Sequence, residues 1–146
     1  MHKSFIELIK QKFALPDVDM RLYSPLALAY IGDSVFDCII RSMIVSQGNR
    51  GGQDLHRYTS GHVCAAAQAL LVELLIPELD DKELGVYKRG RNAKTANTAK
   101  NASVQEYRKA TGFEALIGYL YLQGQEERIL DLIKLGMRKA DENALH

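Results

Sequence analysis

The chain carries apolar residues at helical spacing along most of its length and shows almost none of the alternation typical of strands. The longest helical stretch begins at Ser24, a favourable N-cap residue before Pro25, and its apolar positions continue to Ser46. Loop-forming residues separate it from five further stretches. These are Ser4–Ala14, about Gln53–Leu75, Asp80 to about Arg91, roughly Ser103–Gln123 with a possible break at Gly112, and "GQEERILDLIKLGMRKA". We therefore expect an all-α fold of six to seven helices.

Length and composition limit the class of protein. A chain of 146 residues, 47% of them hydrophobic, fits one domain over residues 1–146 with a single core. No apolar run approaches the roughly 20 residues of a membrane-spanning helix, and the N-terminal stretch lacks the continuous apolar segment of a signal peptide. The two cysteines, Cys38 and Cys64, have no metal-ligand spacing, so we expect reduced thiols in the core of a cytoplasmic protein.

Positive charge is concentrated between Lys88 and Lys109. This segment holds seven basic residues and one acid, Glu106, so that it carries +6 within a chain of net charge +1. Such asymmetry is typical of a surface that binds a polyanion such as a nucleic acid. A solvated basic loop is the alternative, and charge alone does not decide between them.

Two acids stand among small residues on different predicted helices. Asp33 follows Gly32 in the middle of "LALAYIGDSVFD", in a helix that we expect to be largely buried. Glu114 lies between Thr111 and Gly118 in "TGFEALIG". Small residues let two helices approach closely, and contact along these faces would bring both carboxylates together. Converging carboxylates bind hard divalent cations. The alternative is that each acid is separately satisfied by an arginine or a helix cap.

The remaining polar residues suggest no competing chemistry. Asp37 has Arg41 four residues later, so an ion pair along the helix accounts for it. The chain has no phosphate-binding P-loop, no nucleophile elbow and no HExxH zinc motif. The four histidines do not cluster, and we expect them at the surface: His2, His56, His62 and His146.

Several segments taken together resemble a known family. In order and spacing, "LALAYIGDSVFDCIIR", "DLH", "KRGRNAK", "KN", "VQEYR" and "TGFEALIGYLYL" resemble Mini-ribonuclease III, the short branch of the ribonuclease III family without a double-stranded-RNA-binding domain. The resemblance covers about residues 24–135. It implies the all-helical ribonuclease III endonuclease fold and a two-fold homodimer.

The resemblance also implies an activity. It is magnesium-dependent hydrolysis of double-stranded RNA, with Mn²⁺ as a possible substitute, leaving 5′-phosphate and 3′-hydroxyl ends. The expected substrate in this branch is the precursor of the 23S (large-subunit) ribosomal RNA, and by analogy a ribosomal protein or pre-ribosome directs the choice of substrate. The expected phosphate contacts come from the basic segment: Arg89, Arg91, Lys94 and Lys100.

The catalytic residues carry over by position. Asp33 matches the aspartate of the family's "GD" signature and Glu114 the glutamate of its "FEAL" signature, both of which are metal-binding catalytic carboxylates there. Longer members have further acids where this chain has Ala29 and Thr111, as the short branch does. That difference leaves open whether one or two metal ions bind at each site.

Two other functions remain to be weighed. A catalytically inactive RNA-binding or ribosome-assembly module of the same fold would explain the basic segment and the missing acids. It would not explain why both Asp33 and Glu114 are present among small residues. A purely helical protein adaptor explains neither the acids nor the basic segment.

Overall fold

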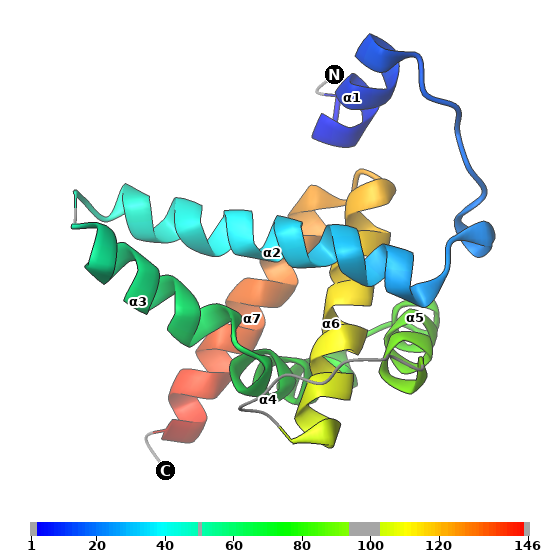
Figure 1. The fold of residues 1–146 in the computed structure, drawn as a ribbon. Coiled ribbons are helices and arrows are strands. Elements are labelled where there is room, and N and C mark those ends of the chain that lie inside the picture. Colours follow the sequence, from blue (N-terminus) through cyan, green and yellow to red (C-terminus); the bar gives the residue numbers. More distant parts are fainter. Residues whose placement is uncertain (1–2, 50, 94–102, 145–146) are drawn as a thin grey trace.

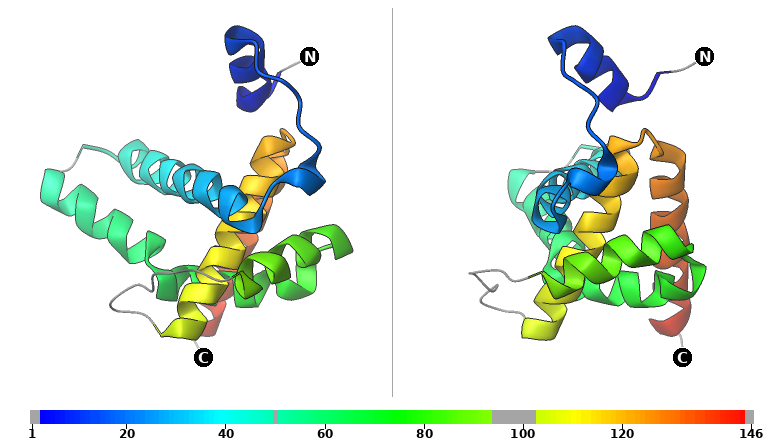
Figure 2. Two further views of the ribbon diagram at one scale, coloured as in Figure 1. Left: turned by 45° about the vertical axis from the view of Figure 1, so that its right-hand side comes forward. Right: turned by 90° about the vertical axis from the view of Figure 1, so that its right-hand side faces the viewer.

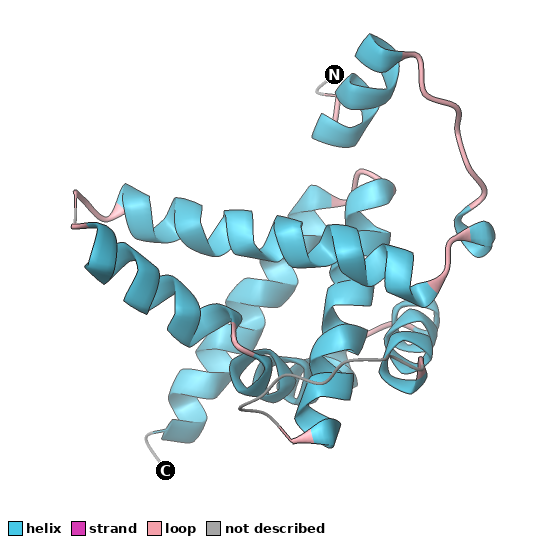
Figure 3. Ribbon diagram, viewed as in Figure 1, coloured by secondary structure: helices cyan, strands magenta, loops and turns pink. Residues whose placement is uncertain are grey.

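The computed structural model describes residues 3–49, 51–93 and 103–144, and within them the regular structure is entirely helical (Figures 1 and 3). Two short 3₁₀ turns, η1 (Met20–Leu22) and η2 (Ile76–Glu78), accompany seven α-helices. The seven are α1 (Phe5–Phe13), α2 (Pro25–Ser46), α3 (Gly52–Val63), α4 (Ala65–Leu75), α5 (Asp81–Asn92), α6 (Val104–Leu122) and α7 (Glu126–Ala144). The prediction of an all-α fold with six to seven helices is confirmed.

Helix α6 lies at the centre of the bundle. Figures 1 and 2 show α2 crossing it, with α5 on one side, α7 behind and α4 near its N-terminal end. The core forms where these helices meet, and its aromatic centre is an edge-to-face pair of Phe36 on α2 and Phe113 on α6, with ring centroids 5.1 Å apart. Both rings are almost fully buried, which fixes the crossing of α2 on α6.

Local sequence sets the helix starts as predicted. The Ser24 hydroxyl accepts a hydrogen bond from the Ala27 N–H, and Pro25 occupies the first turn of α2. Helix α6 begins with a capping box in which Ser103 and Glu106 each accept a hydrogen bond from the other's backbone N–H. These caps satisfy amide groups that would otherwise lack partners at the helix ends.

Two sequence predictions about the middle of the chain are wrong. The single helix expected over about 53–75 is two helices, α3 and α4, because Cys64 takes an extended conformation (φ −67°, ψ 158°) and turns the chain. Both cysteines are exposed instead of buried. Cys64 lies at this junction, and Cys38 lies two residues from both Phe36 and Ile40, so it is on the outer side of α2.

Gly112 does not break α6, which runs without interruption from Val104 to Leu122. A Cβ atom at residue 112 would lie 2.7 Å from the backbone oxygen of Tyr87 on α5. The glycine is therefore needed for the close contact between α5 and α6, and the continuous hydrogen bonding of the surrounding turns offsets its low helix propensity.

Helix α1 stands apart from the bundle and joins it through an extended segment (Figures 1 and 2). None of its residues is buried; its N-terminal end is held by the Phe5 N–H, which donates to Glu126 Oε1 at 2.9 Å. No single helix in the described part of the chain is long and apolar enough to cross a membrane. The bent pair Gly52–Val63 and Ala65–Glu78 reaches that threshold together, by length and composition only.

Candidate active site

The two acids meet where α2 crosses α6. The crossing is close because glycines face backbone: a Cβ atom on Gly32 would overlap the Glu114 carbonyl oxygen, and one on Gly118 would overlap the Leu28 carbonyl oxygen. Both glycines are buried, and no side chain separates the two helices at this point. The prediction that small residues bring these helix faces together is confirmed.

Asp33 and Glu114 lie side by side as a result. The Glu114 carboxyl is within hydrogen-bonding reach of Asp33 and is largely withdrawn from water, whereas Asp33 is exposed. Burial, together with the adjacent Asp33 carboxylate, raises the pKa of Glu114 to about 9. Asp33 thus occupies the solvent edge of α2 and not the buried position expected from its apolar neighbours.

This arrangement suits a cation with a preference for oxygen ligands. Ionisation of Glu114 is unfavourable because its carboxyl is largely buried and lies beside a second acid, and a divalent cation held by both groups would offset this cost. Ala29 and Thr111, one helical turn before Asp33 and Glu114 respectively, are both buried, and the Thr111 hydroxyl donates to the Tyr107 carbonyl at 3.0 Å. Across the described ranges, no group of three or more His, Cys, Asp or Glu residues is placed to hold a metal ion.

Asp37 is engaged elsewhere, as predicted. Its Oδ2 atom lies 2.9 Å from Nε of Arg41, one turn further along α2. The pair is partly exposed and accounts for Asp37 without a catalytic role.

The basic residues predicted to contact RNA lie only partly in the described structure. Arg89 and Arg91 are in the last turn of α5, beside α6; Arg89 is exposed, and the Arg91 guanidinium lies 5.6 Å from the centre of the Tyr87 ring. Their positive charge also suits the C-terminal end of the helix. Lys94 and Lys100 lie outside the described residues.

Two further cations lie near α5 that could not be identified from the sequence. Arg21 on η1 and Lys82 on α5 line the same pocket as Arg89, although 60 residues separate Arg21 from Lys82 in the chain. The only sequence signal was the seven-residue spacing of Lys82 and Arg89, which places both on one face of a helix. No linear pattern indicates that η1 packs beside that face.

Comparison with known proteins gives consistent matches. The Ribonuclease III domain family matches residues 26–125. The chain is 46% identical to the Mini-ribonuclease 3 of Brevibacillus brevis over 116 residues, which is 80% of this chain and 87% of that protein. It is 41% identical to the Mini-ribonuclease 3 of a Thermoanaerobacter species over 142 residues, 97% of this chain and all of that one. The crystal structure of a Fusobacterium nucleatum protein superposes with a TM-score of 0.76 at 33% identity, covering 85% of this chain and 99% of that one.

Proposed function

The chain belongs to the ribonuclease III family, among its Mini-ribonucleases 3, and we propose that Asp33 and Glu114 hold the Mg²⁺ ion with which it cleaves double-stranded RNA. The observation that carries this proposal is the glycine-lined crossing that sets these carboxylates side by side. The expected substrate is the 23S ribosomal RNA precursor in the bacterial cytoplasm, and Mn²⁺ replaces Mg²⁺ at the same ligands.

The two carboxylates have different tasks in this mechanism. Asp33 faces solvent, so its oxygens are accessible to a metal ion that also contacts an RNA phosphate. Glu114 is withdrawn from water and must lose its proton before it can act as a ligand, because burial raises the pKa of its carboxyl group. When bound by these carboxylates, Mg²⁺ would supply an activated water and offset negative charge on the phosphate, so that hydrolysis would leave 5′-phosphate and 3′-hydroxyl ends.

The RNA is held through its backbone. Arg89 and Arg91 lie on α5, which packs against the helix that carries Glu114, and we assign them to phosphate contacts with Lys94 and Lys100. Duplex RNA is recognised mainly by shape, phosphates and 2′-hydroxyls. A ribosomal protein or pre-ribosome then supplies the remaining selectivity.

A homodimer provides the second active site needed to cut both strands. Three exposed apolar residues follow one another at four-residue intervals from η1 into α2, namely Leu22, Leu26 and Tyr30, and Tyr30 is 82% exposed. Such a row is unfavourable in water unless another protein surface covers it. An isologous contact along α2 would relate two active sites by the two-fold axis that a duplex itself has.

Cleavage assays with matched variants test the metal-binding residues. Asp33→Asn and Glu114→Gln are expected to retain the fold and RNA affinity but to lose magnesium-dependent cleavage of a duplex. Asp37→Asn, on the same helix but paired with Arg41, is the control and should retain cleavage. Full cleavage by either of the first two variants would refute the assignment.

A mixed dimer tests the symmetry. Wild-type chains carrying a tag are combined with Asp33→Asn chains, and the heterodimer is purified. It should nick one strand of a duplex and leave the other intact. Double-strand breaks made by single heterodimers, or cleavage by a protein that remains a monomer, would contradict the dimer proposal.

A further inference from the structure

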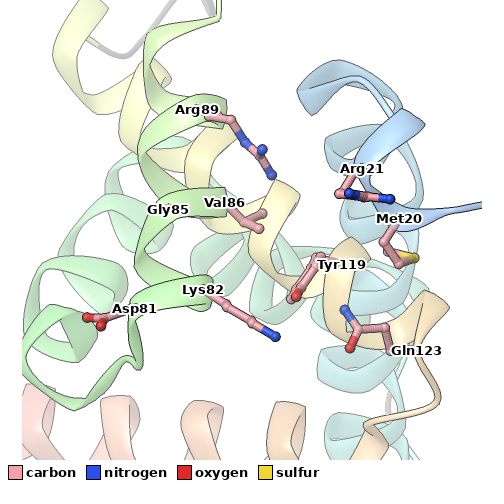
Figure 4. Close-up of a pocket in the computed structure, with 9 residues that line it drawn as sticks. All are labelled: Met20, Arg21, Asp81, Lys82, Gly85, Val86, Arg89, Tyr119 and Gln123. Atoms are coloured by element: carbon pink, nitrogen blue, oxygen red, sulfur yellow. The ribbon is translucent and has the colours of Figure 1, made fainter.

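A pocket of about 590 Å³ opens between η1, α5 and the C-terminal half of α6 (Figure 4). Its volume lies within the range of sites that bind small molecules. The pocket shares α6 with Glu114 but lies on a different side of that helix. Tyr119, which lines the pocket, follows Glu114 by five residues, equivalent to about 140° around the helix and about 7.5 Å along it.

Positive charge dominates the pocket wall. Lys82 and Arg89 extend from α5 across the hollow towards η1 and α6 (Figure 4), and neither has a carboxylate partner within the described ranges. Arg21 completes the set from η1, where it is held by Asp19 at 2.7 Å. The one acid in the lining, Asp81, points away from the hollow in Figure 4.

The neutral groups in the pocket are also suited to donating hydrogen bonds. The Tyr119 hydroxyl comes from α6, and the Gln123 amide comes from the residue that follows this helix. The Gln123 Oε1 atom already accepts a hydrogen bond from Gln125 Nε2 at 2.7 Å, so its amide nitrogen is left to donate. Val86 and Met20 add an apolar wall beside the Tyr119 ring.

We propose that this pocket binds a nucleoside phosphate. Lys82 and Arg89 would hold the phosphate, because an ammonium and a guanidinium are the side chains that best neutralise phosphate oxygens. The apolar wall and the Tyr119 ring would take the base, since bases stack on aromatic side chains whatever their identity. A free nucleotide and the terminal nucleotide of an RNA strand both present this chemistry.

Calorimetric titration of the full-length protein in EDTA tests the site without cleavage. The probes are adenosine 5′-monophosphate, adenosine and inorganic phosphate. The monophosphate should bind saturably and at least tenfold more tightly than adenosine or phosphate alone. Lys82→Glu should weaken its binding at least tenfold, whereas Lys88→Glu, with the same charge change on α5 but outside the pocket lining, should leave it unchanged.

A second set of titrations separates the two sources of the ligand. RNA duplexes with a one-nucleotide 5′ overhang are compared with and without a terminal phosphate. A gain in affinity that needs this phosphate and disappears in Lys82→Glu assigns the pocket to RNA ends. Equal affinity for both duplexes, with tight binding of the monophosphate, assigns it to a free nucleotide.

Three results would overturn the proposal. The first is that neither the monophosphate nor a terminal phosphate binds, and the second is that Lys82→Glu and Lys88→Glu weaken binding equally. The third is that Lys82→Glu makes the protein monomeric in sedimentation while the wild type binds no nucleotide, which would make the pocket an interface between two copies. None of these three results depends on whether the wild-type protein cleaves RNA, so they test the pocket independently of the proposed function.

Discussion

Gly32→Ala is expected to damage both stability and catalysis. The added Cβ would overlap the Glu114 carbonyl oxygen and would lie 2.7 Å from the Glu114 carbonyl carbon and 2.8 Å from the Gly118 nitrogen. Ordinary contact begins at 3.4 Å. All three obstacles are backbone atoms, so no side chain can rotate away, and α2 and α6 must move apart.

The size of the effect follows from two opposing terms. Overpacking a core costs about 1–3 kcal/mol, and backbone obstacles place this site near the upper end, at about 3 kcal/mol. Alanine regains about 1 kcal/mol of helix propensity relative to glycine. The net loss of about 2 kcal/mol should lower the Tm of a chain of this length by about 6 °C. Separation of the helices also displaces Asp33 from Glu114, and misplacement by about 1 Å can reduce the cleavage rate about 100-fold.

Thermal unfolding and duplex cleavage are measured on the same preparations. Gly61→Ala on α3 is the control, because a Cβ there meets no atom within 4 Å and the substitution should leave Tm unchanged or raise it. If Gly32→Ala unfolds at the wild-type Tm and cleaves RNA at the wild-type rate, the account of this crossing is refuted.

Three further perturbations give distinct readouts. In EDTA, the difference in Tm between Glu114→Gln and the wild type should increase from pH 5 to pH 9. Because the Glu114 pKa is raised in the folded state, the wild-type protein loses stability as pH rises towards that pKa, and the glutamine variant does not. An equal difference in Tm at both pH values would contradict this. Arg128→Leu leaves the buried Glu83 carboxylate without its partners at 2.8 Å and should cost about 2–3 kcal/mol at pH 7. Because the Arg128 guanidinium lowers the Glu83 pKa, this cost should shrink below about pH 4, and a pH-independent cost would refute the pairing. The last variant has alanine at all four proposed phosphate contacts: Arg89, Arg91, Lys94 and Lys100. Its RNA affinity should depend less steeply on salt than that of the wild type, and an unchanged slope would show that this surface does not bind phosphate.

Features that depend on residues close together in the sequence could be predicted, such as helix starts and ion pairs within one helix. The start of α2 follows from a serine cap and a first-turn proline, and the Asp37–Arg41 pair follows from four-residue spacing. The meeting of Asp33 with Glu114 was predictable because each acid stands among small residues on an otherwise apolar helix. The sequence could thus indicate which faces touch, although not that Asp33 would remain exposed at the edge of the contact.

Features that depend on tertiary packing could not be predicted in this way. The chain turns at Cys64, whereas the nearest glycine, Gly61, lies inside the last turn of α3, so no local breaker marks the junction itself. Gly112 looks like a breaker, but its role is set by Tyr87 on a different helix. The pocket formed by Arg21 and Lys82 exists only because η1 packs beside α5.

Direct titration of Mg²⁺ tests the central claim that Asp33 and Glu114 together hold the metal. Calorimetry at pH 7.5 in buffers of different ionisation enthalpy measures both metal binding and the protons released with it. Because the Glu114 pKa is raised to about 9, each Mg²⁺ bound should displace about one proton, as expected when a ligand must ionise. Binding should be lost in Asp33→Asn and in Glu114→Gln but retained in Asp37→Asn. Wild-type affinity for Mg²⁺ in both of the first two variants would contradict the account.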